Sequence, residues 1–301
     1  MKRNETSRAN PLQRSEKMAG ALFIAPTLLG LAAVILVPLL YSLAISFSDY
    51  TFIHPEITAF VGWQNFQAAF GDQYFWNSAW VTVLFVVLVV GLELTLGLGI
   101  ALLLNREIKF KGLYYAILTI PMVMSPVAVA LIWKMLLHQE LGIVNYALSW
   151  IGLNPVNWLG SPHGTLFTIV LVDIWHQISF MILVLLAGLV SLPIEPYQAA
   201  KIDGANAFQT LFAITLPLLK PVIATVLLLR TIMAFRTYDL VYIITKGGPG
   251  VSTDVLSYFI YKKTFMGLDL AQASAISWVL LLLVLLMVFG LFRYIKQEET
   301  V

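Results

Sequence analysis

Six long apolar runs, separated by short polar segments, dominate the pattern of hydrophobic and polar positions along the chain. Each run exceeds the roughly 20 residues that a helix needs to cross the hydrocarbon core of a bilayer. The pattern therefore predicts an all-α integral membrane protein with six transmembrane helices in one bundle. The expected helices cover residues 18–47, 77–104, 112–137, 165–190, 222–245 and 271–293.

The composition supports a membrane protein. Of the 301 residues, 59% are hydrophobic and only 11% are charged, whereas a soluble domain carries roughly 25% charged residues. Cysteine is absent, which excludes disulfides, zinc–thiolate sites and cysteine nucleophiles. The first apolar run is too long for the hydrophobic region of a signal peptide, so we expect a first helix that stays in the membrane.

Lysine and arginine are distributed unevenly among the connecting segments. Residues 1–17 hold five of the 18, residues 105–111 hold three, and the 191–221 loop and the C-terminal tail hold two each. The segments expected on the opposite side hold three, all within 246–270. Because cytoplasmic loops are enriched in positive residues, we predict that both termini, 1–17 and 294–301, and the 191–221 loop are cytoplasmic.

The opposite, outer side has features of ordered structure. The stretches "GWQNF" (62–66) and 142–160 mix aromatic residues with asparagine and glycine. Five tryptophans near helix ends are typical of an interfacial aromatic belt: Trp63, Trp76, Trp80, Trp150 and Trp158. Four prolines inside expected helices predict kinks or local openings: Pro26, Pro38, Pro121 and Pro126.

Polar residues within the fourth expected helix share one face. Asp173, His176, Gln177 and Phe180 follow the i, i+3, i+4, i+7 spacing. Polar groups are expensive in a bilayer and usually face a cavity or a partner. Hydrogen-bonding groups beside an aromatic ring suit a sugar, so we interpret this face as part of a substrate pathway; the alternative is a packing face.

The second, third and fifth expected helices also carry charges. Arg230 and Thr237 are seven residues apart and share a face, which makes them further pathway candidates, although Arg230 is equally explained as an anchor inside the bundle. Arg236 and Asp239 are three residues apart and predict an ion pair. Glu93 is expected to hydrogen-bond another helix, and Lys134 to extend toward the membrane interface.

The segment "EPYQAAKIDGANAFQTLFAITLPLLKP" (195–221) interrupts two apolar runs. It predicts a first short helix starting near Pro196, a bend at Gly204 and a second short helix with an apolar stripe. Phe208, Leu211 and Phe212 belong to that stripe and are expected to pack against the inner ends of the membrane helices. Asp203 is expected to cap the second helix, which Pro217 and Pro221 would end.

One set of motifs resembles a known family. Within the loop, the order Gln198, Ala199, Ala200, Asp203, Gly204, Ile214, Leu216, Pro217 resembles the EAA loop of ABC importer permeases. Other blocks resemble binding-protein-dependent sugar permeases: "GWQNF", "GIVN" (142–145), "LLAGLVSLP" (185–193), "FRTYDLVYIITKGGPG" (235–250) and "AQASAIS" (271–277). The chain departs from the motif at Gln198, where the family carries glutamate, so one negative charge is lost.

The resemblance implies the type I ABC importer permease fold in a bacterial inner membrane. It implies that the 191–221 loop couples the chain to a cytoplasmic ATPase and that the chain helps to import a small carbohydrate. The implied partners are a second permease subunit, two ATPase subunits and an extracytoplasmic solute-binding protein, with no nucleic acid. ATP and magnesium would be used by the ATPases, because the chain has no GxxxxGK[ST] phosphate loop and needs no cofactor or metal of its own.

Two other classes of function remain as alternatives. A self-contained secondary transporter would need its own ion-coupling site and would leave the EAA-like loop without a role. A membrane enzyme would need catalytic groups, but the chain has no HExxH or GxSxG motif. His54, His138 and His163 lie in outer segments, and His176 has no obvious nucleophile beside it. The identity of the substrate does not follow from the sequence.

Overall fold

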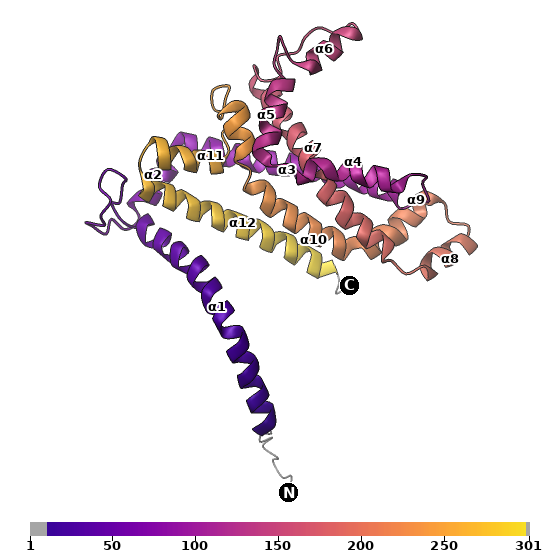
Figure 1. Cartoon of the computed structure of the whole chain (residues 1–301), viewed down its shortest axis with the longest axis horizontal. Coiled ribbons are helices and arrows are strands. Elements are labelled where there is room, and N and C mark those ends of the chain that lie inside the picture. The colour runs from indigo at the N-terminus through magenta and orange to yellow at the C-terminus, as the bar shows by residue number, and fades with distance from the viewer. Residues whose placement is uncertain (1–10, 299–301) are drawn as a thin grey trace.

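The computed structural model describes residues 11–298, which form helices joined by loops (Figure 1). No β-strand occurs in this part of the chain, where a single antiparallel bridge joins Ser48 to Phe60. The α-helices are α1 (Pro11–Ser46), α2 (Gln64–Gly71), α3 (Gln73–Leu104), α4 (Lys111–Val123), α5 (Pro126–Leu136), α6 (Ile143–Trp150), α7 (Pro162–Val190), α8 (Glu195–Ile202), α9 (Ala207–Thr210), α10 (Leu216–Phe235), α11 (Leu256–Tyr261) and α12 (Leu270–Glu298). Three π-helical turns, η1 (Leu211–Thr215), η2 (Val241–Thr245) and η3 (Lys262–Met266), adjoin them. Lys2, Arg3 and Arg8 of the predicted cytoplasmic segment lie outside the described residues.

Five helical segments are long and apolar enough to cross a membrane: 23–46, 73–104, 162–190, 207–235 and 270–290. A sixth crossing requires α4 and α5 together, which are bent by 98° relative to each other. The chain is therefore a multi-pass membrane protein, as the apolar pattern predicted. Four of the six predicted runs are found as long helices, the third is broken, and the fifth is shifted toward the N-terminus.

The break between α4 and α5 follows from Pro126. Proline disfavours helical geometry in the residue before it, and Ser125 is extended with ψ 134°. Met124 is extended as well, and Pro126 then occupies the first turn of α5. The predicted opening occurs at this proline, whereas α1 continues through Pro26 and Pro38.

The fifth transmembrane helix does not occupy the predicted residues 222–245. It begins at Ala207 and ends at Phe235, so Pro217 and Pro221 do not end the preceding helical segment. The turn η1 lies just before Pro217, and the Leu216 N–H bonds to the Leu211 carbonyl five residues back. This wider turn changes the hydrogen-bond register where a proline must be accommodated.

The centre of the bundle is formed by α3, α7 and α10, which contact one another along two apolar clusters. Two glycines allow close helix contact: a Cβ at Gly97 of α3 would lie 2.9 Å from Met181 Cγ of α7, and one at Gly188 of α7 would lie 2.7 Å from Val222 of α10. Small residues at such crossings let membrane helices pack through van der Waals contact. The core of the molecule is thus a three-helix unit.

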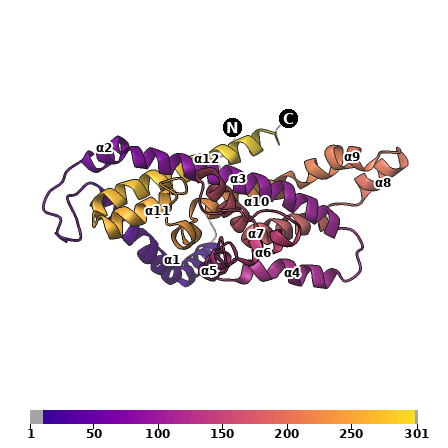
Figure 2. The ribbon, with the colours of Figure 1, turned by 90° about the horizontal axis from the view of Figure 1, so that it is seen from above.

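The other elements surround this unit. Seen from above, α2 and α11 lie toward one end of the molecule and α8 and α9 toward the other (Figure 2). Helix α1 contacts α12 but diverges from the bundle (Figure 1), and most of its large apolar side chains are exposed. The predicted order of the outer loops is confirmed by α2 and α6. Of the five tryptophans predicted for an aromatic belt, Trp158 packs against the core and the other four are exposed.

Candidate functional site

A buried ion triad joins the three central helices. The Arg230 side chain of α10 is 1% exposed, and its Nε donates to Glu93 Oε2 of α3 at 2.5 Å while Nη2 donates to Oε1 at 3.0 Å. Nη2 also pairs with Asp173 Oδ2 of α7. The predicted hydrogen bond from Glu93 to another helix is confirmed, and the Arg230 anchor interpretation is supported. One guanidinium group thus connects carboxyl groups from two other helices.

The triad borders a cavity of about 120 Å³ that collects most of the predicted pathway residues. Asp173, His176 and Gln177 of α7 line it together with Arg230 and Thr237. The remaining lining residues are Pro126, Met233, Arg236, Tyr238, Asp239 and Leu240. The helix-face pattern therefore identified residues that are neighbours in space. The cavity is also lined by residues at or next to two helix breaks, 124–125 and 236–238.

His176 satisfies a backbone carbonyl that the α4–α5 break leaves free. Its Nε2 lies 3.2 Å from the Met124 carbonyl oxygen, and Gln177 Nε2 lies 3.2 Å from His176 Nδ1. A carbonyl only accepts, so Nε2 carries the proton and Nδ1 accepts from the Gln177 amide. Broken membrane helices are tolerated where neighbouring groups satisfy the backbone in this way.

The predicted ion pair between Arg236 and Asp239 is wrong. Within residues 11–298, no ion pair joins these two side chains, although both line the cavity. The i, i+3 spacing brings side chains together only within a helix, and α10 ends at Phe235 while residues 236–238 are not helical. The same break means that Arg230 and Thr237 do not share a helix face, yet the turn returns Thr237 to the cavity.

Phe180 and Lys134 also differ from expectation. Phe180 is not among the residues that line the cavity; it lies one helical turn further along α7, against the apolar cluster that contains Met181 and Leu185. Lys134 does not merely extend along the surface, since its Nζ donates to the Ile243 carbonyl oxygen at 2.7 Å. That bond connects α5 to the η2 turn.

A cluster of four tyrosines next to the cavity was not predicted. Tyr238, which lines the cavity, stacks on Tyr242 with ring centroids 5.3 Å apart and lies 5.2 Å from the Tyr261 ring. Tyr258 completes the group. The four tyrosines come from two segments, 238–242 and 258–261, which lie apart in the sequence and meet only in the folded chain. Such rings present flat apolar faces beside hydroxyl groups.

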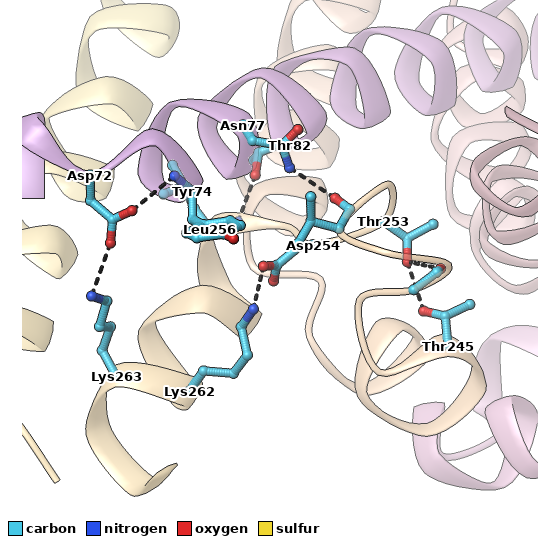
Figure 3. Close-up of polar contacts among 12 residues, drawn as sticks. Asp72, Tyr74, Asn77, Thr82, Thr245, Thr253, Asp254, Leu256, Lys262 and Lys263 are labelled. Atoms are coloured by element: carbon cyan, nitrogen blue, oxygen red, sulfur yellow. Dashed lines mark hydrogen bonds and ion pairs between the residues drawn. The ribbon is translucent and has the colours of Figure 1, made fainter. Parts of the chain in front are cut away.

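The N-terminal end of α3 is connected to the 246–266 segment by a polar network (Figure 3). Lys263 Nζ lies 3.0 Å from Asp72 Oδ2, and Lys262 pairs with the buried Asp254. Asn77 Nδ2 donates to the Val251 carbonyl oxygen at 2.8 Å. Burial raises the pKa of the Asp254 carboxyl, and the contact with Lys262 acts in the opposite direction. This network fixes the segment that follows the second helix break.

The EAA-like loop forms two helices with a bend, as predicted. Gly204 has φ +75°, and the Ala205 N–H bonds to the Ala200 carbonyl at 2.9 Å while the Gly204 N–H bonds to that of Lys201 at 3.3 Å. This is a Schellman motif at the end of α8. Ala200 is buried, whereas Gln198 and Ala199 are exposed.

Asp203 does not cap the second helix. It is the C-cap residue of α8, and Asn206 caps α9 by accepting from the Phe208 and Gln209 N–H groups. The Gln209 side chain accepts from the Asn206 N–H in return, which forms a capping box. The bend at Gly204 and Ala205 moves the helix start beyond the reach of Asp203.

Phe208, Leu211 and Phe212 were predicted to pack against the membrane helices, and this is wrong for the two phenylalanines. Leu211 is half-buried and lines a cavity at the ends of α3 and α7. The two phenylalanine side chains are 72% and 57% exposed, and their rings contact each other at a tilt with centroids 5.0 Å apart. Ile202 is 86% exposed nearby. The i, i+4 spacing puts both rings on the same outward face, so the loop presents an apolar surface.

Comparison with known proteins gives one family and several relatives. The family described as "Binding-protein-dependent transport system inner membrane component" matches residues 93–297. The chain is 41% identical to the trehalose/maltose transport system permease protein MalF of Thermococcus litoralis, over 95% of each chain. It is 35% identical to the sulfoquinovosyl glycerol transport system permease protein SmoG of Agrobacterium fabrum, over 96% of this chain and 94% of that one.

A solved structure is similar as well. A chain of a bacterial alginate ABC transporter, crystallised in complex with an alginate pentasaccharide-bound periplasmic protein, superposes with a TM-score of 0.77. The match covers 93% of this chain and 94% of that chain at 26% identity. The resemblance drawn from the sequence motifs thus extends to the whole fold.

Proposed function

The chain belongs to the family of binding-protein-dependent transport system inner membrane components, and from this premise we propose that it is the membrane subunit of an ATP-driven importer for a small carbohydrate. Its relatives are named as permeases for trehalose and maltose and for sulfoquinovosyl glycerol. Sugar, polyol and glycoside substrates all fit the proposal. Import then runs from the outer side toward the side of the 191–221 loop.

The observation that carries the proposal is the convergence of polar groups on one cavity at two helix breaks. Gln177 and Thr237 offer an amide and a hydroxyl to substrate hydroxyl groups, and the Tyr238 ring supports the apolar C–H face of a sugar. Membrane helices leave regular geometry where they line a cavity. Arg236 lines the cavity but remains exposed in this chain alone, which fits a pathway completed by a second permease subunit.

The exposed loop surface fits a cytoplasmic ATPase subunit as its partner. Ile202 and the Phe208–Phe212 pair are large apolar side chains exposed on the segment that carries the family motif. ATP closing the two ATPases would move this loop as a rigid body and turn α10 with it. We assign ATP and magnesium to those partners and no cofactor to this chain. An extracytoplasmic solute-binding protein is the fourth partner, as the complex of the alginate transporter with a periplasmic protein suggests.

Uptake by variants of the assembled importer tests the pathway. Gln177→Ala and Thr237→Ala each remove one substrate hydrogen bond, which is worth about 0.5–1.5 kcal/mol, so transport affinity should fall roughly two- to tenfold. Thr225→Ala is the matched control, because its hydroxyl bonds within α10 to the Pro221 carbonyl and does not line the cavity. Asp173→Ala is a poor test, since Asp173 also belongs to the buried triad.

The same measurements separate the proposal from its alternatives. Full uptake by both cavity variants would reject the pathway. Uptake that persists without ATPase subunits would favour a secondary transporter instead. Loss of the second permease subunit from the purified complex, together with loss of uptake, would mean that this face is a subunit interface.

A further inference from the structure

A second and larger cavity, of about 540 Å³, lies at the end of the molecule that carries the EAA-like loop. Its walls come from the last turn of α3 and the residues that follow it, from the end of α7, and from α8 to η1. Figures 1 and 2 both show α8 and α9 projecting beyond the ends of these long helices. The cavity therefore lies where apolar membrane helices meet the polar loops.

The lining of this cavity is divided into an apolar and a cationic part. Leu102, Leu189 and Leu211 contribute the apolar part at the helix ends, and Phe208 of α9 adds an aromatic ring. Arg106 and Lys201 contribute two cations, and no aspartate or glutamate lines the cavity. In the described part of the chain, neither cation takes part in an ion pair. Two unneutralised cations facing one cavity without a carboxylate indicate an anionic ligand.

Neutral hydrogen-bonding groups accompany the cations. Asn105, Tyr197 and Thr210 line the cavity, and the Tyr197 hydroxyl lies 3.1 Å from Thr215 Oγ1. An arginine fork, an ammonium group and neutral donors together suit the oxygens of a phosphate. The leucine wall beside them suits an acyl chain. A ligand that meets both needs is amphipathic and anionic.

We propose that this cavity binds the headgroup of an anionic phospholipid from the adjacent leaflet. Basic pockets between membrane helices at the cytoplasmic side are known to hold such headgroups. The position at the ends of α3 and α7 favours a lipid over free phosphate, because acyl chains reach the leucine wall directly. The proposal requires only that the chain spans the membrane and does not depend on the substrate or on ATPase docking.

The lipid and the ATPase would use different faces of α8. Tyr197 and Lys201, four residues apart, line the cavity, whereas Gln198 and Ile202 do not. The i, i+4 spacing gives α8 one face toward the lipid and a neighbouring face that carries the motif residues. A bound headgroup would therefore stabilise the base of the loop and leave Gln198, Ile202 and Phe212 free. Phe208 also lines the cavity and would lie between the two partners.

The test is lipid retention by the full chain purified from bilayers of phosphatidylcholine and phosphatidylglycerol, measured by native mass spectrometry. We expect the wild type to retain phosphatidylglycerol preferentially. The Arg106→Gln/Lys201→Gln variant should lose about tenfold or more of that retention, since each cation near an anionic headgroup contributes to binding. The matched control is Lys109→Gln/Lys111→Gln. It removes two cations that lie close to Arg106 in the sequence but do not line the cavity, and it should retain the lipid.

Three results would overturn the proposal. The first is equal retention of both lipids by the wild type. The second is equal loss in the two double variants, which would mean diffuse attraction to the membrane surface. The third is displacement of the retained lipid by millimolar inorganic phosphate, which would identify a site for free phosphate.

Discussion

Arg230 connects three membrane helices through one guanidinium group. Its two carboxylate partners, Glu93 and Asp173, are 0% and 3% exposed. The triad is stable only when all three side chains are present, because removing one member of a buried ion network leaves an uncompensated charge.

Arg230→Met should therefore destabilise the protein by about 3–5 kcal/mol, visible as a lower melting temperature in detergent and a lower yield. The triple variant Arg230→Met/Glu93→Gln/Asp173→Asn should recover much of this loss, since no buried charge remains. Arg236→Met is the control, because Arg236 is exposed and unpaired within residues 11–298. Equal melting temperatures for Arg230→Met and Arg236→Met would contradict a stabilising triad.

At the scale of elements, Gly204 sets the angle between α8 and α9. Its φ of +75° lies in the left-handed region, while a Cβ at this position would have no neighbour within 4 Å. Backbone conformation, and not lack of space within this chain, is therefore the reason for glycine here.

Gly204→Val should distort the bend at a cost of about 1–2 kcal/mol, reducing uptake and co-purification of ATPase subunits while the protein still inserts. Gly204→Asn should retain much of both, because asparagine tolerates left-handed geometry. Gly99→Val is a control on α3, where a Cβ also meets nothing within 4 Å and φ is not positive. If Gly204→Val and Gly204→Asn behaved alike, steric exclusion by a partner would replace the conformational explanation.

Element positions also show how far the sequence could predict this fold. Length and hydropathy predicted six crossings because the bilayer imposes both. The fifth helix was misplaced because Pro217 and Pro221 were interpreted as helix ends, although η1 allows the helix to continue through them. The break at 236–238 depends on tertiary packing, which the local sequence pattern does not contain. The absence of the predicted ion pair between Arg236 and Asp239 follows from this break.

The candidate site was predictable to a similar extent. Helical spacing placed Asp173, His176 and Gln177 on one face, and all three line the cavity. The triad was not predicted, because Glu93, Asp173 and Arg230 are separated by 57 to 137 residues and no periodicity relates them. The tyrosine cluster was missed for the same reason.

For the whole molecule, the distribution of lysine and arginine predicts which side of the membrane each loop occupies. Helix α12 begins near α2 and runs toward the side of α8, so the C-terminal end and the EAA-like loop lie on the same side (Figure 1). The loop that contains α6 lies on another part of the surface.

A reporter active only outside the cytoplasm should be silent after Thr300 and active when inserted at the exposed Gly152 between α6 and α7. A reporter active only inside should give the opposite result. The physical reason is the excess of positive residues in the segments expected to be cytoplasmic. Activity of the outside reporter after Thr300 would contradict this orientation.

The π-helical turn η1 has a consequence for how the two ends of the fifth membrane helix are linked. Arg230 and the second half of the EAA-like loop, from Ala207 onward, belong to one continuous helical segment, so they keep a fixed angular offset about its axis. Deleting Ala213 within η1 should convert the turn to regular α-helix and rotate the loop by about 100° relative to Arg230, with a shortening of about 1.5 Å. The variant should insert and keep the triad but lose uptake, because α8 would present a different face to its partner. Normal uptake would mean that transport does not depend on this angular offset. A single residue in this turn thus sets the angle at which motion at one surface of the membrane reaches the cavity within it.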